Sequence, residues 1–464
     1  MGTIAHWMRR FNHALEASSQ VLTLLSPESV EQRCREAGHH CRRSFWSPAN
    51  TLTAWLLQTL SESKTLRQGV MEMIDLQVTR RAIDRSRRPS SDPSAFCAAR
   101  KRLPARVIEA TLRETISRIE QLAGESVLWL GRRVWIVDGS SATMPDAPEL
   151  QAAFPQPSEQ KPGCGFPVMS LLVVFCWATG TVIDLAMGSL RDSERQQFRR
   201  LMGRFGPGDL VLADRGFCSY VDIARLLMQG ADVAFRLHAC KRKFRQIKCF
   251  GRNDCLITWE RPRWIRTFGL TREDYERLPE QLTLRMVWTR CTGRGQRSRE
   301  IVLVTTILDP KEASAGELLG LYRDRWLAEM NLKSLKITLG MDILRGKSVD
   351  VVRKEVLMHV LLYNVIRLMM WEAAQARGKN ARRLSFAAAL DQLQIEARHL
   401  LGGGKWVGEK LLRLLELLRE ITRHVVPSRP GRTEPRRLKR RQKHFSKMVE
   451  SRAHYRRTGD PHAD

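Results

Sequence analysis

A short segment in the last third of the chain combines residue types that could act on a phosphodiester. At the period of an α-helix, one face of this segment carries Tyr322, Arg325, Trp326, Glu329, Lys333 and Lys336. A carboxylate on such a face can bind a metal ion, while cations contact a phosphate backbone and an aromatic ring stacks on a base. The alternative is a solvated helix, because Arg325 to Glu329 and Glu329 to Lys333 are ordinary i,i+4 pairs.

Two aspartates follow apolar runs in the middle of the chain. Asp138 ends the run 134–137 and precedes Gly139, and Asp214 ends the run 210–213 and is also followed closely by glycine. An acid at the tip of a buried strand is held rigidly yet projects from the sheet edge, and a glycine lets a ligand approach. Acids also cap strand ends for turn chemistry alone, so each aspartate by itself is a weak signal.

The three carboxylates together are a stronger signal than any one of them. Hydrolysis or transfer at a phosphodiester needs two or three carboxylates around metal ions about 4 Å apart. Mg²⁺ suits this task because it prefers oxygen ligands and keeps waters that substrate oxygens can replace. Asp138, Asp214 and Glu329 could supply such a site, and no histidine, cysteine or serine nucleophile is required. Other acids of this region lack a place at the end of an apolar strand and are interpreted as turn, cap or surface residues: Asp146, Asp184, Asp192 and Glu194.

The elements that must position these acids follow from the hydrophobic pattern. Apolar runs with period two predict strands at 134–137, 168–177, 181–186, 209–213, 232–237 and 301–307. Helices are predicted at 193–205 and 220–229, so the region is a mixed α/β sheet. The basic, turn-rich stretch before the last strand is too long for a loop, which predicts a mostly β insertion at about 238–300.

Arg-rich helical sequence precedes this sheet. Two short basic helices joined by a Ser/Pro turn are predicted near residues 80–103, and the second carries Arg100, Lys101 and Arg102. This arrangement is compatible with a DNA-reading module and equally with a basic solvated face. Helices also follow the sheet, and a basic tail with little apolar content ends the chain and is expected to be disordered or loosely helical alone.

The charge of the chain indicates a polyanionic partner. Among its 464 residues, 78 are Lys or Arg and 49 are Asp or Glu, which gives a formal net charge of +29. Nucleic acid gains most from such a surface through neutralised phosphates and released counterions, and an anionic membrane is the weaker competitor. No segment predicts a membrane span, the amino terminus lacks a signal-peptide core, and the ten cysteines form no paired framework, so we expect a cytoplasmic protein.

The chain resembles the cut-and-paste DDE transposases of bacterial insertion sequences, in particular the insertion sequence four family. The resemblance rests on Asp138-Gly139-Ser140, Ala213-Asp214-Arg215-Gly216-Phe217 and Tyr322-x2-Arg325-x3-Glu329-x6-Lys336. Supporting matches are Gly165-Phe166-Pro167, Gly206-Pro207-Gly208-Asp209 and the upstream Arg100-Lys101-Arg102-Leu103. The resemblance spans roughly residues 26–371.

This resemblance implies an enzyme that cleaves and joins DNA strands with Mg²⁺, for which Mn²⁺ is expected to substitute. It assigns two Mg²⁺ ions to Asp138, Asp214 and Glu329, and the phosphates of the transposon end to Tyr322, Arg325 and Lys336. Trp326 is expected to stack on a base pulled from the duplex. The implied partners are double-stranded DNA and a second copy in a homodimer, at the nucleoid of a bacterial cytoplasm. The alternatives are a catalytically silent, transposase-derived DNA-binding regulator and a structure-selective nuclease of the same fold.

The resemblance also completes the predicted organisation. The fold class is α/β, with a ribonuclease H-like mixed-sheet core, a mostly β insertion and helical domains on both sides. The predicted domains are a helical, basic DNA-end-binding domain at 1–125, a catalytic core at 126–349, a helical region at 350–427 and a basic tail at 428–464.

Overall fold

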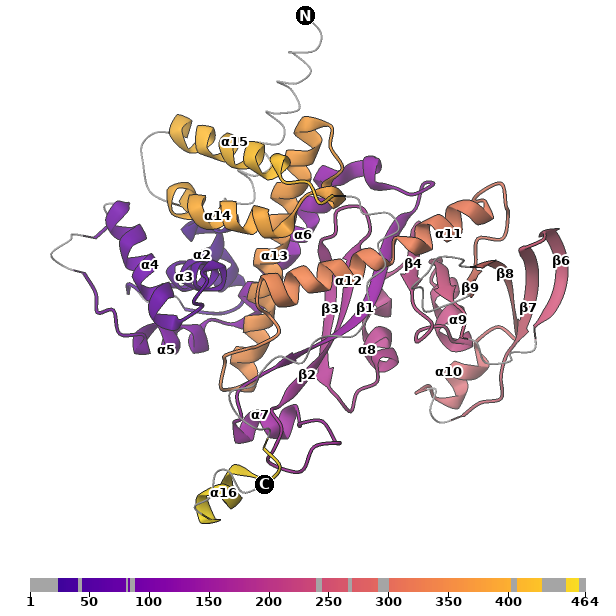
Figure 1. Ribbon diagram of the computed structural model, residues 1–464, viewed down its shortest axis with the longest axis horizontal. Helices are drawn as coiled ribbons and strands as arrows, with labels where there is room; N and C mark the ends of the chain where they lie inside the picture. Colours follow the sequence, from indigo (N-terminus) through magenta and orange to yellow (C-terminus); the bar gives the residue numbers. More distant parts are fainter. Residues whose placement is uncertain are drawn as a thin grey trace, which may run out of the picture. The chain divides into compact units, whose positions relative to one another are not determined.

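The described part of the chain forms two compact units (Figure 1). The computed structural model describes residues 24–40, 44–80, 82–83, 88–238, 244–265, 269–290, 300–401, 407–427 and 448–458. Residues 1–23, parts of the β insertion and most of the predicted basic tail lie outside the described residues. The helical unit contains Met1–Ser126, Thr179–Val182 and Asn331–Pro427, and the sheet unit contains Val127–Ala178, Ile183–Met330 and Ser428–Asp464.

Among the described residues, nine strands form one sheet with the order β3-β2-β1-β4-β5-β9-β8-β7-β6. The strands are β1 Arg133–Thr143, β2 Val168–Cys176, β3 Val182–Ser189, β4 Asp209–Ala213, β5 Asp232–Arg236, β6 Arg245–Gly251, β7 Asp254–Glu260, β8 Gln281–Arg290 and β9 Glu300–Thr305. β1 is antiparallel to β2 and parallel to β4, and β4 is parallel to β5. This mixed sheet confirms the predicted α/β class, because continuous apolar runs become buried strands.

The β insertion continues the main sheet (Figure 1). β9 pairs with β5 on one side and with β8 on the other, and β7 and β6 extend the ladder from β8. Arg285 of β8 is fully buried and donates hydrogen bonds to the two carboxylate oxygens of Asp254 at 2.7 and 2.5 Å. It also donates to the carbonyl oxygen of Ala313 at 2.6 Å, which ties the insertion to the segment just before α11 Ala315–Arg323.

Short helices alternate with these strands along the chain. They are α7 Pro148–Ala153, α8 Glu194–Leu201, α9 Tyr220–Met228, α10 Arg272–Glu276, α11 Ala315–Arg323 and α12 Trp326–Lys333, with α16 Arg452–Thr458 near the end of the chain. A capping box between Ser193 and Gln196 begins α8, which packs against β2 through a hydrogen bond from Gln197 to Ser170 at 2.8 Å. α9 packs against β5, and α11 against β8.

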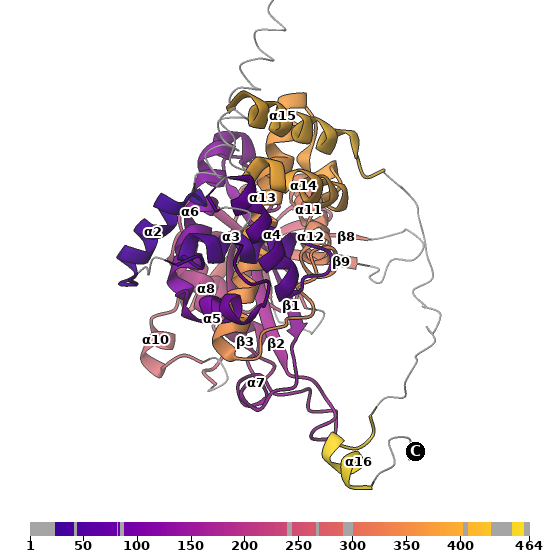
Figure 2. The same ribbon diagram turned by 90° about the vertical axis from the view of Figure 1, so that its left-hand side faces the viewer.

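The helical unit is built around α13 Val349–Arg377, which packs against α3, α6, α14 and α15. Its other helices are α2 Pro27–Glu36, α3 Pro48–Leu60, α4 Leu66–Thr79, α5 Ser94–Arg102, α6 Ala105–Ala123, α14 Phe386–Leu401 and α15 Val407–Arg423. Figure 2 shows α14 and α15 side by side, in agreement with their contacts. Of the helices that the structure describes, α13 alone is long and apolar enough to cross a membrane, and its apolar stretch is completely buried, as in a core helix.

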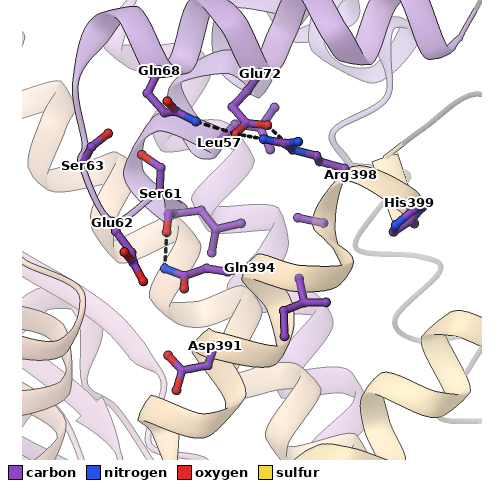
Figure 3. Close-up of a pocket in the computed structure, with 13 residues that line it drawn as sticks. Leu57, Ser61, Glu62, Ser63, Gln68, Glu72, Asp391, Gln394, Arg398 and His399 are labelled. Carbon is purple, nitrogen blue, oxygen red and sulfur yellow. Dashed lines mark hydrogen bonds and ion pairs between the residues drawn. The ribbon is translucent and has the colours of Figure 1, made fainter.

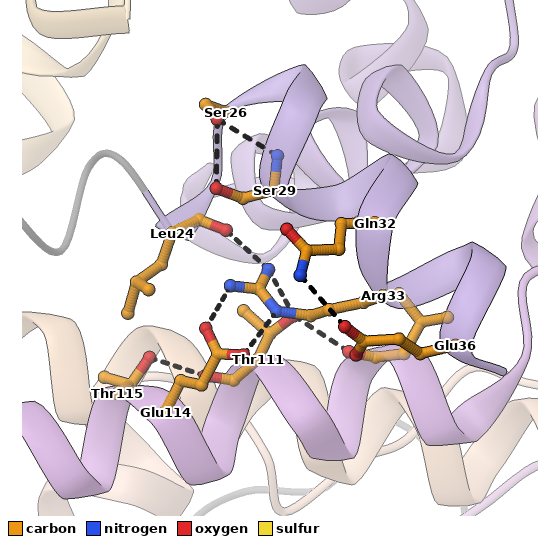
Figure 4. A network of polar contacts seen from close by, with 10 residues as sticks. Leu24, Ser26, Ser29, Gln32, Arg33, Glu36, Thr111, Glu114 and Thr115 are labelled. Atoms are coloured by element: carbon orange, nitrogen blue, oxygen red, sulfur yellow. Dashed lines mark hydrogen bonds and ion pairs between the residues drawn. The ribbon is translucent and has the colours of Figure 1, made fainter.

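A buried arginine of α2 bonds to α6 in this unit. The Arg33 guanidinium in α2 donates hydrogen bonds to the Leu24 carbonyl at 2.6 Å, to Thr111 at 3.2 Å and to Glu114 at 3.1 Å (Figure 4). Thr111 and Glu114 lie on α6, so one side chain fixes α2 against α6. Removal of Glu114 would leave a buried charge without its carboxylate partner, which is the costly way to break such a pair.

Candidate active site

Asp138 and Asp214 lie where two parallel strands separate. β1 and β4 pair as far as Ile136 and Leu212, and β4 then ends directly before Asp214. β1 instead continues to Thr143 against β2. The prediction that Asp138 ends its strand is therefore wrong. The acid lies inside β1 and borders the space that β4 leaves when it turns away, so it is both rigidly held and accessible from one side.

The turn after β4 fixes Asp214. The backbone amide of Gly216 donates a hydrogen bond to Asp214 Oδ1 at 2.7 Å. The carbonyl of Gly216 in turn accepts one from Nε of Arg195 in α8, also at 2.7 Å. The ring of Phe217 contacts that of Phe198 edge to face, with centroids 5.5 Å apart. Helix α8 thus supports the turn that carries Asp214.

The chain around Glu329 forms two consecutive helices in place of one. α11 ends at Arg323 and α12 begins at Trp326. Between them, the amides of Asp324 and Arg325 donate to carbonyl oxygens three residues earlier, as in a 3₁₀-helix. The prediction of one continuous helical face from Tyr322 to Lys336 is therefore wrong, because this tight turn changes the angle between successive side chains.

A side chain from β2's end fixes this junction. The indole Nε1 of Trp177 donates a hydrogen bond to Asp324 Oδ2 at 3.0 Å. Asp324 also caps the end of α11 through its backbone amide. Since β2 is paired with β1, this bond links the start of α12 to the sheet that carries Asp138. The positioning roles of Trp177 and Asp324 were not predicted from the sequence.

Arg325 lies between two of the predicted catalytic acids. Its Nη2 donates a hydrogen bond to Glu329 Oε1 at 2.8 Å, and its Nη1 lies 3.6 Å from Asp138 Oδ2. Burial acts to lower the pKa of Arg325, but Tyr322, Glu329 and Asp138 raise it overall. Tyr322 is buried, and burial raises the pKa of its hydroxyl, with Arg325 opposing and Asp214 adding to the rise. The charges of Asp138 and Glu329 thus act on Arg325, and the charge of Asp214 acts on the neighbouring Tyr322.

The pKa of the Asp138 carboxyl is strongly raised. Burial raises the pKa of Asp138 from 3.8 to about 6, the Arg325 guanidinium and the Gly139 amide oppose the rise, and the charges of Glu329 and Asp214 add to it. A carboxyl that is repelled by two other carboxylates indicates a place where a cation is favoured. The structure thus brings Asp138, Asp214 and Glu329 into one electrostatically coupled group.

The other residues of the predicted helical face are not among the partners of Arg325 described above. Trp326 begins α12 and is 57% exposed, which leaves its ring accessible to solvent. Lys336 lies in the π-helical turn Ser334–Thr338, which belongs to the helical unit. Burial lowers the pKa of Lys336, and Asp342 opposes this effect. Lys333 is the last residue of α12.

The structure contradicts the predicted DNA-binding role of Arg100. Its side chain is 5% exposed, its guanidinium lies 4.1 Å from the ring centre of Trp55, and its Nη1 donates a hydrogen bond to Gln58 at 3.3 Å. The guanidinium is thus used inside the helical unit as a packing group. Lys101 and Arg102 are exposed at the end of α5. The predicted basic helix before α5 is also wrong where it can be tested, since α4 ends at Thr79.

Glu194 was interpreted from the sequence as a turn, cap or surface residue, and it is exposed as the first residue of α8. Its carboxyl lies against Gly139: a Cβ atom added there would lie 2.0 Å from Glu194 Oε1, so a larger residue would displace this carboxylate. The place beside Gly139 that the sequence suggested for a ligand is therefore occupied by a carboxylate.

A cavity of about 760 Å³ lies in the helical unit (Figure 3). It is lined by the end of α3 and the loop after it, by α4 and by α14. Arg398 pairs with Glu72 on one side, and Gln68 donates a hydrogen bond to Glu72 at 2.7 Å. None of the predicted catalytic acids lines this cavity, so it is separate from the candidate active site.

The acid cluster fits a hard divalent cation by its donor chemistry. Within the described ranges, no three acidic, histidine or cysteine side chains are gathered closely enough to hold a metal ion as they stand. The three acids nevertheless offer only oxygen donors, which Mg²⁺ and Mn²⁺ prefer. A positive group, the Arg325 guanidinium, already lies between Asp138 and Glu329.

Comparison with known proteins identifies the family. The model of the transposase DDE domain matches residues 129–365, which include all three acids. The chain belongs to the transposase DDE domain family. It is 23% identical over 421 residues to the transposase InsG for insertion sequence element IS4 of Escherichia coli (strain K12), and the match covers 90% of this chain and 91% of that protein. A piggyBac transposase in a synaptic complex with hairpin DNA matches with 11% identity and a TM-score of 0.38, over 92% of this chain and 87% of that one.

These findings confirm the predicted insertion sequence four relationship and the ribonuclease H-like core. Transposase function, with metal-dependent DNA cleavage and strand transfer, follows from the family. A divalent metal ion and DNA are thus the cofactor class and the partner that the family uses.

Proposed function

We propose that this transposase excises and inserts its element by a cut-and-paste route in which Asp138, Asp214 and Glu329 bind two Mg²⁺ ions, with Mn²⁺ as a substitute. The main support is the coupling of these three carboxylates on β1, after β4 and on α12, with Arg325 between two of them. When bound, the ions would activate the attacking oxygen and stabilise the leaving oxygen of a phosphodiester. Each step is then an in-line displacement without a covalent enzyme intermediate.

The side chains around the acids would bind and orient the DNA. Arg325 would exchange Glu329 for a phosphate of the transposon end, since guanidinium groups bind phosphates and carboxylates with the same geometry. Tyr322 would hold the guanidinium in this orientation, as its contact with Arg325 suggests. Lys336 would bind a neighbouring phosphate. The exposed ring of Trp326 would stack on a base pulled from the duplex near the cut.

The other parts of the chain would assemble the DNA complex. We assign binding of the transposon end to residues 1–125, where Lys101 and Arg102 are exposed, and catalysis to residues 126–349. Residues 350–427 form the helical support, and the basic tail at 428–464 would add electrostatic contacts to DNA. We expect a homodimer that pairs two ends before cleavage, and a location at the nucleoid of a bacterial cytoplasm, because the partner is double-stranded DNA.

Cleavage and strand transfer by single acid variants test this assignment. Asp138→Asn, Asp214→Asn and Glu329→Gln should each reduce Mg²⁺-dependent cleavage of an end duplex by at least about 10³-fold, because each removes a charged ligand of the ions that would stabilise the reacting phosphodiester. Each variant should still bind the end duplex in a mobility-shift assay. Asp146→Asn is the matched control, because Asp146 is exposed on the loop after β1. Normal cleavage by any of the three variants would contradict the assignment.

Pre-cleaved ends distinguish the alternatives. With Mg²⁺ and a target plasmid, the transposase should join the 3′-hydroxyl of such an end to the target. A structure-selective nuclease would cut but yield no joined product. A silent DNA-binding regulator would bind with a steep salt dependence and neither cut nor join.

A further inference from the structure

We propose that Cys249 and Cys255 form a site of reversible oxidation, at which hydrogen peroxide joins the two thiols as a disulfide between β6 and β7. The proposal concerns the outer edge of the sheet and does not depend on the assignment of metal or DNA ligands. Three features of the β6–β7 hairpin carry it: the register of the two strands, the unequal exposure of the two thiols, and the loose attachment of β6.

The ladder register places the two cysteines directly opposite each other. In the antiparallel pair of β6 and β7, Cys249 is the partner of Cys255. Directly opposed residues of such a pair have Cα atoms about 4.5 or 5.5 Å apart and side chains on the same face. Both spacings lie within the range of about 4.4–6.8 Å that a disulfide requires. Among the cysteines that the structure describes, no other two are ladder partners.

The two thiols differ in exposure, as a peroxide-reactive pair requires. Cys249 is exposed on the edge strand and accepts a hydrogen bond from the side-chain amide of Gln246, whereas Cys255 is 1% exposed. Burial raises the pKa of the Cys255 thiol, and the nearby Cys249 adds to the rise, as expected for sulfur atoms that lie close together. The exposed thiol is therefore the one that peroxide reaches first.

The chemistry of the pair is balanced by hydrogen peroxide alone. The Cys249 sulfur attacks one peroxide oxygen, the O–O bond breaks, and a sulfenic acid and a water are formed. The Cys255 thiol then attacks the sulfenic sulfur, the S–S bond forms, and a second water leaves with the thiol proton. The two thiols are thus oxidised to one disulfide while one hydrogen peroxide is reduced to two waters.

β6 is the outermost strand of the sheet and is attached mainly through its ladder with β7 (Figure 1). All of its residues are exposed, and its register on β7 shifts once before and once after Cys249. A strand without buried side chains has a weakly specified register. β6 can therefore move by the roughly 1 Å that separates ordinary ladder spacing of the Cβ atoms from that of a disulfide. The bond would then lock β6 in this register.

The bond is expected to be reversible. Cys249 lies on the exposed edge strand, so the thiolate of a dithiol reductant can attack its sulfur. Exposed disulfides are reduced more readily than structural ones. In a reducing compartment the pair should therefore be present as thiols until peroxide is encountered.

Peptide mapping of the full-length protein tests the site. The protein is treated with hydrogen peroxide, free thiols are blocked with N-ethylmaleimide, and the denatured chain is digested with trypsin without reductant. Trypsin cuts after Arg252, between the two cysteines, so the disulfide appears in the mass spectrum as two peptides that dithiothreitol separates. Cys249→Ser should abolish the joined peptides. Cys164→Ser, which removes a partly exposed cysteine on the loop before β2, is the matched control and should leave them unchanged.

Cys255→Ser separates the roles of the two thiols. Without its partner, the sulfenic acid of Cys249 should persist and be trapped by dimedone, whereas the wild type should convert it to the disulfide. A disulfide from Cys249 to a different cysteine or to a second chain would overturn the proposal. The same conclusion would follow if both thiols stayed free at a peroxide concentration that oxidises Cys164.

Limited proteolysis measures the effect of the bond on β6. In the folded protein, trypsin cleaves after Lys248 when β6 leaves the ladder. Oxidation should slow this cleavage by roughly 10-fold or more, because a bond that closes so short a loop disfavours the open hairpin. Dithiothreitol should restore the rate, and oxidation should not slow the cleavage of Cys255→Ser. Equal rates for the oxidised and the reduced wild type would contradict the locking of β6.

Discussion

Asp138→Asn should stabilise the metal-free protein while it eliminates cleavage. The pKa of Asp138 is raised from 3.8 to about 6 in the folded protein, with burial as the main cause. A folded pKa above the unfolded value means that the charged form is disfavoured in the native state. The contribution of this group to stability is therefore fully present below pH 3.8 and is lost as the pH rises through 6. An asparagine carries no charge and avoids this loss.

The magnitude follows from the two pKa values. A shift of about 2.2 units corresponds to a maximum of about 3 kcal/mol, since one unit is worth about 1.4 kcal/mol. Integration between the two pKa values gives a loss for the wild type of about 1 kcal/mol at pH 4.5 and about 3 kcal/mol at pH 7.5. The advantage of Asp138→Asn should therefore grow by about 2 kcal/mol between these pH values. The side chain is 20% exposed, so solvent screening makes these figures upper bounds.

Urea denaturation with EDTA present measures this difference at both pH values. The urea midpoint of Asp138→Asn should exceed that of the wild type clearly at pH 7.5 and by less at pH 4.5. Glu273→Gln serves as the control, because Glu273 is exposed and distant in sequence from the acid cluster, and its midpoint should follow the wild type. A variant that is less stable than the wild type at pH 7.5, or whose advantage is the same at both pH values, would refute the reasoning.

Three further predictions concern the insertion, the exposed ring and the metal. Asp254→Asn should destabilise the protein by about 3–5 kcal/mol in urea denaturation, because it leaves the Arg285 guanidinium buried without its carboxylate partner. The control Arg272→Ala removes an exposed ion pair and should cost less than about 1 kcal/mol. Equal losses of stability in the two variants would contradict the burial argument. Trp326→Ala should change the urea midpoint little, since the ring is 57% exposed. It should weaken binding of an end duplex by about 1–3 kcal/mol, the contribution of one base stacked on an aromatic ring, and unchanged affinity would exclude base stacking by this ring. EDTA should abolish cleavage but leave binding of an end duplex intact in a mobility-shift assay, because basic side chains, and not the metal ions, contact most of the phosphates. Residual cleavage in EDTA would contradict metal dependence.

The sheet could be predicted well from the sequence because its strands are continuous apolar runs. β2 and β4 begin and end within one residue of their predicted positions. β1 was predicted too short, since Ser140 and Ser141 do not resemble a strand in isolation. They become one because β2 supplies the partners Leu171 and Ser170. Pairing across the sheet, and not the local sequence, sets the end of β1.

The candidate site could be predicted only in part. The ends of two apolar runs pointed to Asp138 and Asp214, although β1 continues past Asp138, and helical spacing pointed to Glu329 beside Arg325. The junction before Trp326 is bonded to Trp177, which is far away in the sequence, so no local pattern reveals this contact. Arg100 was misjudged for the same reason, because its burial depends on the ring of Trp55 from another helix.

The position of β9 has a consequence for how members of this family can diverge. β9 pairs directly with β5, through Phe235 with Val304 and Arg236 with Leu303. The chain therefore returns to the core ladder before it enters α11 and α12, whatever lies between β5 and β9. The outer strands β6 and β7 can therefore change in length while the covalent route from the core to Glu329 keeps its length. β8 is more constrained, because it packs against α11 and its Arg285 bonds to the segment before that helix.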